Sequence, residues 1–261
     1  AITLKELEEA RDKVRWGKER RSLAISEKEK ENTAYHEAGH AILLCLLENT
    51  EPLHKVTIIP RGPSLGSTMW LPEEDKFTNR KNELLDQLVV TMGGRVAEEV
   101  VFGDVTNGAS GDIRQATHMA RKMVCEWGMS DELGMIEYGD HQEHLFLARE
   151  LSSPRNYSEA TAQKIDAEVK RLIDTAYAKA TDLIVSHRDK LNAIAKGLLE
   201  YETLDAGHIR EIMEFGELRN PPSSPTPPDL PEEPAAPVAP PAKPSRASED
   251  DLPGDLAPAG A

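Results

Sequence analysis

The sequence predicts a mainly α-helical fold with one small β-hairpin. Apolar residues recur at helical spacing over most of residues 26–219, whereas strand-like alternation is confined to about 54–71. The chain has 261 residues, which is enough for one or two domains with a sizeable core. The final 42 residues hold 13 of the 18 prolines, so we do not expect them to belong to the helical domain.

Two helical segments are predicted at the N-terminal end, and the second begins at a recognisable cap. Residues 1–25 carry charges of both signs around a thin apolar stripe, which is typical of a solvated helical connector. Ser26 followed by Glu29 is a capping-box pattern and predicts the start of the next helix. That helix should run to about Leu47 and end before Pro52.

A short β-hairpin is predicted next. Residues 54–59 alternate between polar and apolar side chains, and a second short apolar run covers 65–71. Pro60, Gly62 and Pro63 separate the two runs and are typical turn residues.

The remaining pattern is helical. Helical spacing resumes at Arg80 and continues to Gly103, with Gly93 and Gly94 in the middle. Each glycine inside a helix costs about 1 kcal/mol relative to alanine, so this pair indicates close approach by another backbone. Further helices are predicted over the following ranges: 112–127, a long helix starting after Ser158, 191–199 and 205–215.

The C-terminal segment 220–261 is predicted to be a disordered acidic tail rich in proline and alanine. It has no aromatic residue and carries seven acidic against two basic side chains, so it cannot bury enough apolar surface to order itself. Prolines at every third position from Pro225 to Pro237 leave a docking ligand as an alternative role.

Composition excludes several classes of protein. The formal net charge of -15 has the wrong sign for binding nucleic acid. Cys45 and Cys125 lie in apolar helical runs without paired spacing, which argues against a disulfide framework or a thiolate zinc site. The longest uncharged apolar run, 38–47, is about half the roughly 18 residues that a membrane span needs. We therefore expect these residues to form a soluble chain.

The motif His36-Glu37-Ala38-Gly39-His40 is the part of the sequence that indicates a catalytic site. Two histidines at i and i+4 on a helix point to one side, where they can bind one zinc ion, and Glu37 beside them can act as general base. The competing interpretation is a pair of surface histidines. However, the helix becomes wholly apolar over 41–47, which places the histidines at the entrance to a core and favours zinc.

A catalytic zinc needs a third protein ligand, and the spacing leaves it open. A metzincin continuation is excluded because Leu43 and Leu46 stand where glycine and histidine would be required. Asp112 could be a ligand or the N-cap of its helix, and Glu98 or Glu99 could supply a ligand, hold a histidine, or lie on a solvated face. Weaker candidates are His54, His118, His141 and His144.

Several segments together resemble the protease domain of the FtsH family of membrane-anchored, ATP-dependent zinc metalloproteases. They cover about 1–215 in the family's order. The segments are Ser26-Glu27, Thr33-Ala34-Tyr35-His36-Glu37-Ala38-Gly39-His40-Ala41, His54-Lys55-Val56-Thr57-Ile58-Ile59-Pro60-Arg61-Gly62, Leu65-Gly66, Gly93-Gly94-Arg95-Val96-Ala97-Glu98-Glu99, Gly108-Ala109-Ser110-Gly111-Asp112 and Trp127-Gly128-Met129-Ser130.

The resemblance implies a role for each site residue. Asp112 matches the aspartate that completes the family's zinc site with His36 and His40, and Glu37 matches the catalytic base. Glu98 matches a glutamate close to the site, which we expect to support a ligand rather than bind the metal.

The sequence departs from the family at two positions just before the predicted helix 112–127. Gly111 stands where the family commonly has asparagine, and Asn107 stands where it commonly has threonine. Neither position matches a ligand, but both lie in the segment that presents the aspartate.

The resemblance also implies a substrate-binding strand and a larger parent protein. Val56, Thr57, Ile58 and Ile59 match the edge on which the family docks an extended peptide. Family members carry transmembrane segments and an AAA+ ATPase, whereas these residues include no Gly-x-x-x-x-Gly-Lys-Ser/Thr phosphate loop and no span. We therefore expect a fragment that begins after the ATPase, with 1–25 as the connector. ATP would be used only by the missing module. The resemblance implies a homo-hexamer in the bacterial inner membrane, with this domain facing the cytoplasm.

The sequence thus predicts that residues 26–219 form a helical zinc-peptidase domain with the small hairpin near its active site. Its expected function is zinc-dependent endopeptidase cleavage of unfolded or misfolded proteins, with one Zn²⁺ per chain. The alternative is a proteolytically silent module that holds a hexamer together and binds zinc structurally. The intact residues His36, Glu37, His40 and Asp112 favour the enzyme.

Overall fold

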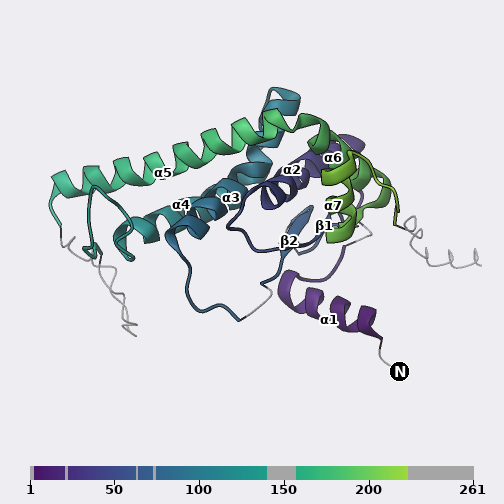
Figure 1. The fold of residues 1–261 in the computed structure, drawn as a ribbon, viewed down its shortest axis with the longest axis horizontal. Helices are drawn as coiled ribbons and strands as arrows, with labels where there is room; N and C mark the ends of the chain where they lie inside the picture. Colours follow the sequence, from purple (N-terminus) through teal and green to yellow (C-terminus); the bar gives the residue numbers. More distant parts are fainter. Residues whose placement is uncertain (1–2, 21–22, 63, 73–74, 140–156, 223–261) are drawn as a thin grey trace, which may run out of the picture. The chain divides into compact units, whose positions relative to one another are not determined.

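The computed structural model describes residues 3–20, 23–62, 64–72, 75–139 and 157–222 (Figure 1). The predicted tail from 223 onward lies outside the described residues, as do His141 and His144. Within the described part the fold is mainly α with one small antiparallel sheet, which confirms the predicted class. The elements are α1 (Leu4–Trp16), α2 (Glu27–Leu46), β1 (Leu53–Thr57), β2 (Ser67–Trp70), α3 (Lys81–Phe102), the 3₁₀ turn η1 (Asn107–Ala109), α4 (Ser110–Cys125), α5 (Glu159–Ser186), α6 (Arg188–Tyr201), β3 (Thr203–Asp205) and α7 (Ala206–Phe215).

Helix α2 forms the centre of the fold. It begins where its cap predicts, because the Ser26 hydroxyl accepts a hydrogen bond from the Glu29 amide at 3.2 Å. The return bond differs from the usual capping box, since the Glu29 carboxylate accepts from the Ser26 hydroxyl at 3.3 Å. The second half of α2 is almost wholly buried and packs on α3, α6 and α5. The motif helix is therefore held from several sides.

Two glycines bring α2 and α3 into backbone contact. A Cβ atom added to Gly39 would lie 2.3 Å from the carbonyl oxygen of Gly93, and one added to Gly93 would lie 2.5 Å from that of Gly39. Gly94, one residue further, faces a side chain instead, since its added Cβ would lie 2.4 Å from the His36 ring. The predicted close approach at the Gly93-Gly94 pair is confirmed. Gly93 makes room for the α2 backbone, and Gly94 makes room for the His36 ring.

The sheet has three strands in the order β2-β1-β3, all antiparallel. The predicted hairpin is present as β1 and β2, but β3 was not predicted because three residues between two helices are too few to show alternation.

The predicted substrate edge at Val56–Ile59 is wrong, because β1 is the central strand. Val56 pairs with Thr68 on one side and with Leu204 on the other. The amide of Ile58 donates to the carbonyl of Glu202 at 2.9 Å. Backbone hydrogen bonds on both sides leave no free edge there for a peptide, and β2 lies at the edge of the sheet instead.

The segment between α3 and α4 presents Asp112. Gly103 ends α3 in the left-handed conformation, with φ of 68°. Thr106 then caps η1, and α4 starts at Ser110 with Ala109 in the cap position. Asp112 is thus in the first turn of α4, and the N-cap interpretation is wrong.

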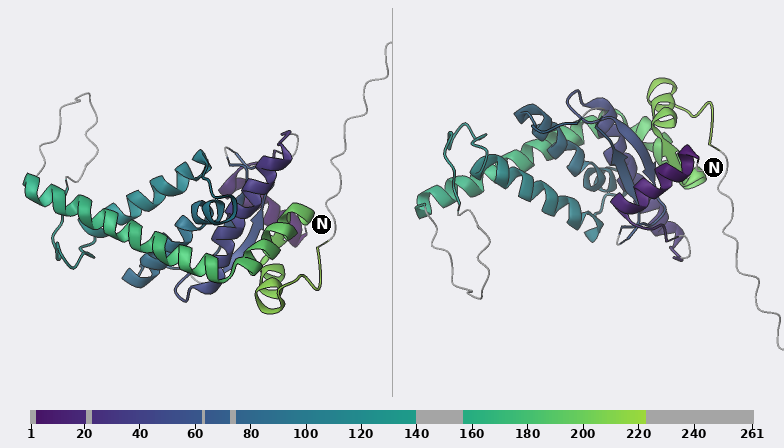
Figure 2. Two further views of the ribbon diagram at one scale, coloured as in Figure 1. Left: turned by 90° about the horizontal axis from the view of Figure 1, so that it is seen from above. Right: turned by 90° about the horizontal axis from the view of Figure 1, so that it is seen from below.

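The long helix α5 packs along α3 and α4, and the small sheet lies near α6 and α7 (Figure 2). Ser158 caps α5 through the amide of Thr161 at 3.2 Å, as its sequence pattern predicts. None of the helices in the described ranges is both long and apolar enough to cross a membrane.

The N-terminal segment contacts the sheet through buried charges. Asp12 of α1 has no exposed surface and pairs with Lys55 of β1. Burial raises the pKa of Asp12, but Lys55 and Arg11 outweigh that effect and leave this pKa below its usual value. Further along, Arg61 is buried and bonds to the carbonyl of Gly17 and to Glu19. The connector boundary at residue 25 stays a prediction.

We expect Gly39→Ala to destabilise the protein by at least about 1–3 kcal/mol, because the added methyl group would collide with the α3 backbone rather than with a movable side chain. Gly111→Ala is the matched control. Its added Cβ meets nothing within 4 Å, and alanine is preferred in a helix, so we expect stabilisation by about 0.5–1 kcal/mol. Urea denaturation of the two variants measures both effects, and equal midpoints would contradict the tight contact.

Candidate metal centre and active-site cleft

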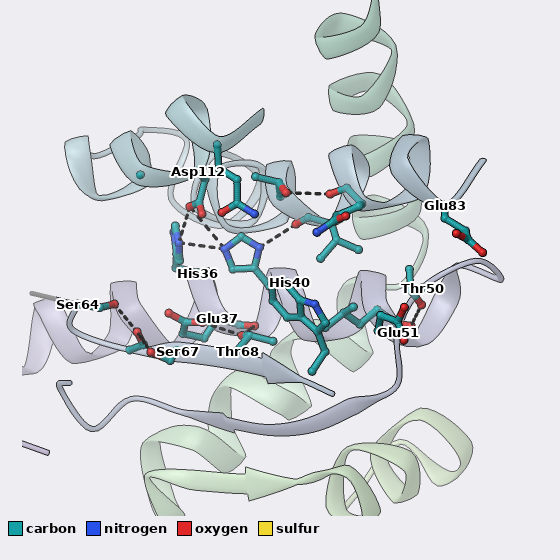
Figure 3. A pocket seen from close by; sticks show the side chains of 18 of the residues that line it. His36, Glu37, His40, Thr50, Glu51, Ser64, Ser67, Thr68, Glu83 and Asp112 are labelled. Carbon is teal, nitrogen blue, oxygen red and sulfur yellow. Dashed lines mark hydrogen bonds and ion pairs between the residues drawn. The ribbon is translucent and has the colours of Figure 1, made fainter. Parts of the chain in front are cut away.

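Three side chains from two helices converge on one point. His36 and His40 come from α2, and Asp112 comes from the first turn of α4. The Nε2 atoms of the two histidines are 3.2 Å apart. Oδ2 of Asp112 lies 3.2 Å from Nε2 of His36 and 3.6 Å from Nε2 of His40 (Figure 3). The structure thus brings together the two motif histidines and the aspartate that the family resemblance assigns to the site.

The spacing of these atoms fits a tetrahedral zinc ion. With zinc–ligand distances of about 2.0–2.1 Å, the ligand atoms of a regular tetrahedron lie about 3.3–3.4 Å from one another. The three observed distances bracket this value. Two imidazole nitrogens and one carboxylate are also a common donor set for zinc with an open fourth position. Among the described residues, this is the group of histidines and acids arranged to hold a metal.

Hydrogen bonds on the far side of each ring orient the histidines. Nδ1 of His40 lies 2.8 Å from the carbonyl oxygen of Val90, which can only accept, so Nδ1 carries the proton. Nδ1 of His36 lies 2.8 Å from Oε1 of Glu98. In the neutral tautomer in which Nδ1 donates, the Nε2 atom of each ring has its lone pair available for a metal.

Glu98 links His36 to the segment that presents Asp112. Its carboxylate is almost fully buried, and Oε2 accepts from the Thr106 amide at 2.9 Å and from the Thr106 hydroxyl at 3.0 Å. Burial raises the pKa of Glu98, but the hydrogen bonds from His36 and Thr106 outweigh burial and leave this pKa below its usual value. The group is therefore a carboxylate at neutral pH. Glu98 thus contacts His36 on one side and Thr106 on the other, and its role in supporting a zinc ligand stays a prediction.

The charges around His36 favour a cation. Burial lowers the pKa of this imidazole, but the hydrogen bonds with Asp112 and Glu98 outweigh burial and raise the pKa to about 10. For Asp112, burial raises the pKa and the bonds with His36 and His40 lower it well below its usual value. The N-terminus of α4 also stabilises the negative charge of Asp112, which lies in its first turn.

Glu37 lies beside the triad in a cleft of about 530 Å³. The cleft is lined on one side by α2 and on the other by the edge strand β2, with Thr68 opposite Glu37 (Figure 3). Glu37 is largely buried, and Oε2 accepts a hydrogen bond from the Thr68 hydroxyl at 2.6 Å. A carboxylate therefore stands next to the triad where a cleft admits a ligand.

The other candidates from the sequence lie elsewhere. Glu99 is exposed and accepts from the hydroxyl of Tyr177 on α5. His54 lies 2.8 Å from the Arg11 guanidinium, and His118 is exposed on α4. Three partners of the site were not predicted from the sequence: Val90, Thr106 and Thr68. The Val90 contact uses a backbone carbonyl, for which a sequence has no signal. Thr68 lies in the predicted second strand and Thr106 in the loop between two predicted helices, and neither belongs to a motif that indicates a role in the site.

A mainly helical domain with such a triad and an adjacent carboxylate in a cleft has the organisation of a metalloprotease. Comparison with known proteins agrees. Residues 23–212 match the model of peptidase family M41. The chain therefore belongs to peptidase family M41.

Several similar proteins are named as FtsH proteases, which confirms the resemblance. "ATP-dependent zinc metalloprotease FtsH 2" of Methylacidiphilum infernorum is 65% identical over 218 residues, covering 84% of this chain and 34% of the relative. "ATP-dependent zinc metalloprotease FtsH" of Akkermansia muciniphila is 57% identical over 223 residues, covering 85% and 28%. The protein of that name from Thermotoga maritima is 50% identical over 213 residues, covering 81% and 35%. The chain spans about a third of the length of these relatives.

We expect Glu98→Ala to weaken zinc binding by about 10–100-fold, because His36 would lose the acceptor that fixes its ring and Thr106 would lose its anchor. Glu99→Ala, on the next residue of the same helix, is the control and should leave the affinity unchanged. Competition with a chromophoric chelator measures both. Equal affinities of the two variants would contradict the role of Glu98.

Zinc affinity should also rise with pH. Because the pKa of His36 is about 10 without metal, zinc must displace a proton from the site at neutral pH. The apparent affinity should therefore increase about tenfold per pH unit from pH 6 to 9, as expected for release of one proton. Chelator competition at several pH values, corrected for protonation of the chelator, gives the slope. A slope of zero would show that no proton is displaced.

Proposed function

We propose that this chain is a zinc-dependent endopeptidase that hydrolyses peptide bonds of unfolded or misfolded proteins, with His36, His40 and Asp112 holding one Zn²⁺. The observation that carries the proposal is the near-tetrahedral spacing of the three ligand atoms at the wall of a cleft that also contains Glu37. Membership of peptidase family M41 supports the reaction class.

The chain's own residues supply binding and proton transfer. When bound, zinc supplies a Lewis acid that polarises the scissile carbonyl and makes water acidic near neutral pH. The carboxylate of Glu37 accepts a proton as the water attacks, and it returns that proton to the amine nitrogen as the peptide bond breaks. With zinc held by the two Nε2 atoms, Nδ1 of His36 would still donate to Glu98 and Nδ1 of His40 to the Val90 carbonyl, which would keep both rings in place.

The edge strand β2 is the proposed docking site for the substrate backbone. It lies at one side of the sheet, and its residues Ser67, Thr68 and Trp70 line the cleft. An extended peptide could add to this edge by backbone hydrogen bonds, which bind without demanding a particular sequence. This suits unfolded substrates, and it moves the proposed docking strand from β1 to β2.

The alternative function, a silent assembly module with structural zinc, has less support. Structural zinc sites are closed by four protein ligands, whereas the group found among the described residues has three members and adjoins a cleft. A structural site would also have no use for Glu37, which contributes no atom to the triad.

The parent protein is proposed to be an ATP-dependent, membrane-anchored protease. The matched part is 34% and 28% of two similar proteins that are named as ATP-dependent zinc metalloproteases. An AAA+ ATPase module would unfold substrates and deliver them to a homo-hexameric ring of these domains at the bacterial inner membrane. ATP would act only in that module, and the membrane would be reached only through segments outside this chain.

We expect Glu37→Gln to lower kcat by about 10²–10⁴-fold while zinc content and melting temperature stay unchanged, because the amide cannot accept the proton but fills the same space. The assay is cleavage of a permanently unfolded protein by this chain, which does not require an ATPase.

A zinc chelator and re-addition of zinc serve as controls on the parent chain. Cleavage should stop with the chelator and return with zinc. Unchanged cleavage by Glu37→Gln would contradict the proposed base. If the unmutated chain assembles and binds one zinc per chain but does not cleave the substrate, the assembly module would be favoured instead.

A further inference from the structure

Glu37 is held by the strand opposite to it. The Thr68 hydroxyl lies 2.6 Å from Oε2 of Glu37 and 3.1 Å from the Glu37 carbonyl oxygen. A hydroxyl has one proton to donate, and a carboxylate at the shorter distance is the stronger acceptor. The proton of Thr68 therefore points to the Glu37 carboxylate.

Gly66 faces the other side of the same carboxylate. A Cβ atom added to Gly66 would lie 2.8 Å from both Cγ and Oε1 of Glu37. The Gly66 carbonyl is itself fixed by the Ser67 hydroxyl at 2.7 Å and by that of Ser64. The missing side chain at Gly66 thus leaves the space that the Glu37 carboxylate occupies.

These contacts divide the two oxygens of Glu37 between different tasks. Oε2 is occupied by Thr68, whereas Oε1 accepts no hydrogen bond from the described residues. A carboxylate that is free to rotate would spend part of its time with neither oxygen directed at the reacting water. Fixing one oxygen leaves the other as a defined proton acceptor, which is the positional control that general-base catalysis requires.

We infer that Thr68 is a positioning residue that holds the Glu37 carboxylate in its reactive orientation, with Gly66 providing the space in which that orientation fits. The inference rests on the proposed role of Glu37 as general base. It also connects the base to β2, so that the strand proposed to dock the substrate is the same strand that orients the base.

The test compares three variants of this chain. Thr68→Val keeps the shape of the side chain but removes the donor, and Thr68→Ser keeps the donor but removes the methyl group. Thr175→Val is the matched control, because the Thr175 hydroxyl bonds to the Arg171 carbonyl on the exposed face of α5. Cleavage of an unfolded protein is measured over a range of substrate concentrations, together with zinc content.

We expect Thr68→Val to lower kcat about tenfold, with zinc content and KM unchanged, and Thr68→Ser to recover most of the parent rate. Thr175→Val should match the parent. Equal rates for Thr68→Val and the parent would overturn the inference. It would also be overturned if Thr68→Ser were as slow as Thr68→Val, because the methyl group and not the hydroxyl would then be responsible.

Crystal structures of the parent chain and the two Thr68 variants give a second readout that needs no activity. Glu37 should take one orientation in the parent and in Thr68→Ser, and a different one or several in Thr68→Val. An unchanged Glu37 in Thr68→Val would overturn the inference even if the chain proves to be a peptidase. Conversely, a parent chain that does not cleave would refute the proposed function while this comparison still decides the role of Thr68.

Discussion

The backbone contact between Gly39 of α2 and Gly93 of α3 is the constraint on which the site depends. A Cβ atom on either residue would lie 2.3–2.5 Å from the carbonyl oxygen of the other. Only glycine at both positions therefore lets the two helices come this close. This closeness brings the Val90 carbonyl and the Glu98 carboxylate of α3 within hydrogen-bond distance of the two histidines of α2. It also makes Gly94 necessary, because the His36 ring occupies the space of its missing side chain.

Once the helices are in contact, the electrostatics of the site follow from three acids around two imidazoles. Asp112 and Glu98 bond to the histidines, and the Glu37 charge also favours protonated His36. Such a concentration of negative charge in a largely buried site is costly unless a cation compensates it. A zinc ion placed between the three ligand atoms would supply that compensation, so metal binding and the stability of this region are coupled.

The cleft is built from two kinds of element with different tasks. Helix α2 carries His36, Glu37 and His40 within about one turn, which fixes their mutual distances. The short sheet provides the opposite wall, and its edge strand β2 contacts Glu37 through Thr68. Burial of the central strand β1 between β2 and β3 holds that wall in place. The chemistry is therefore located at the junction of a helix and a strand edge.

The sequence by itself determined the local features of this protein. Periodicity and caps determined the helices, as at Ser26 and Ser158, and the spacing of His36 and His40 alone placed both imidazoles on one face. Asp112, the third proposed zinc ligand, could be named from the sequence only through resemblance to a family, since spacing left a cap and a ligand equally open. Contacts between distant segments were decided only by the tertiary structure: the third strand β3, the central place of β1, and the contacts of Val90, Thr106 and Thr68. The physical reason is that a short strand or a backbone carbonyl has no local pattern of its own, and its role arises only from what packs against it.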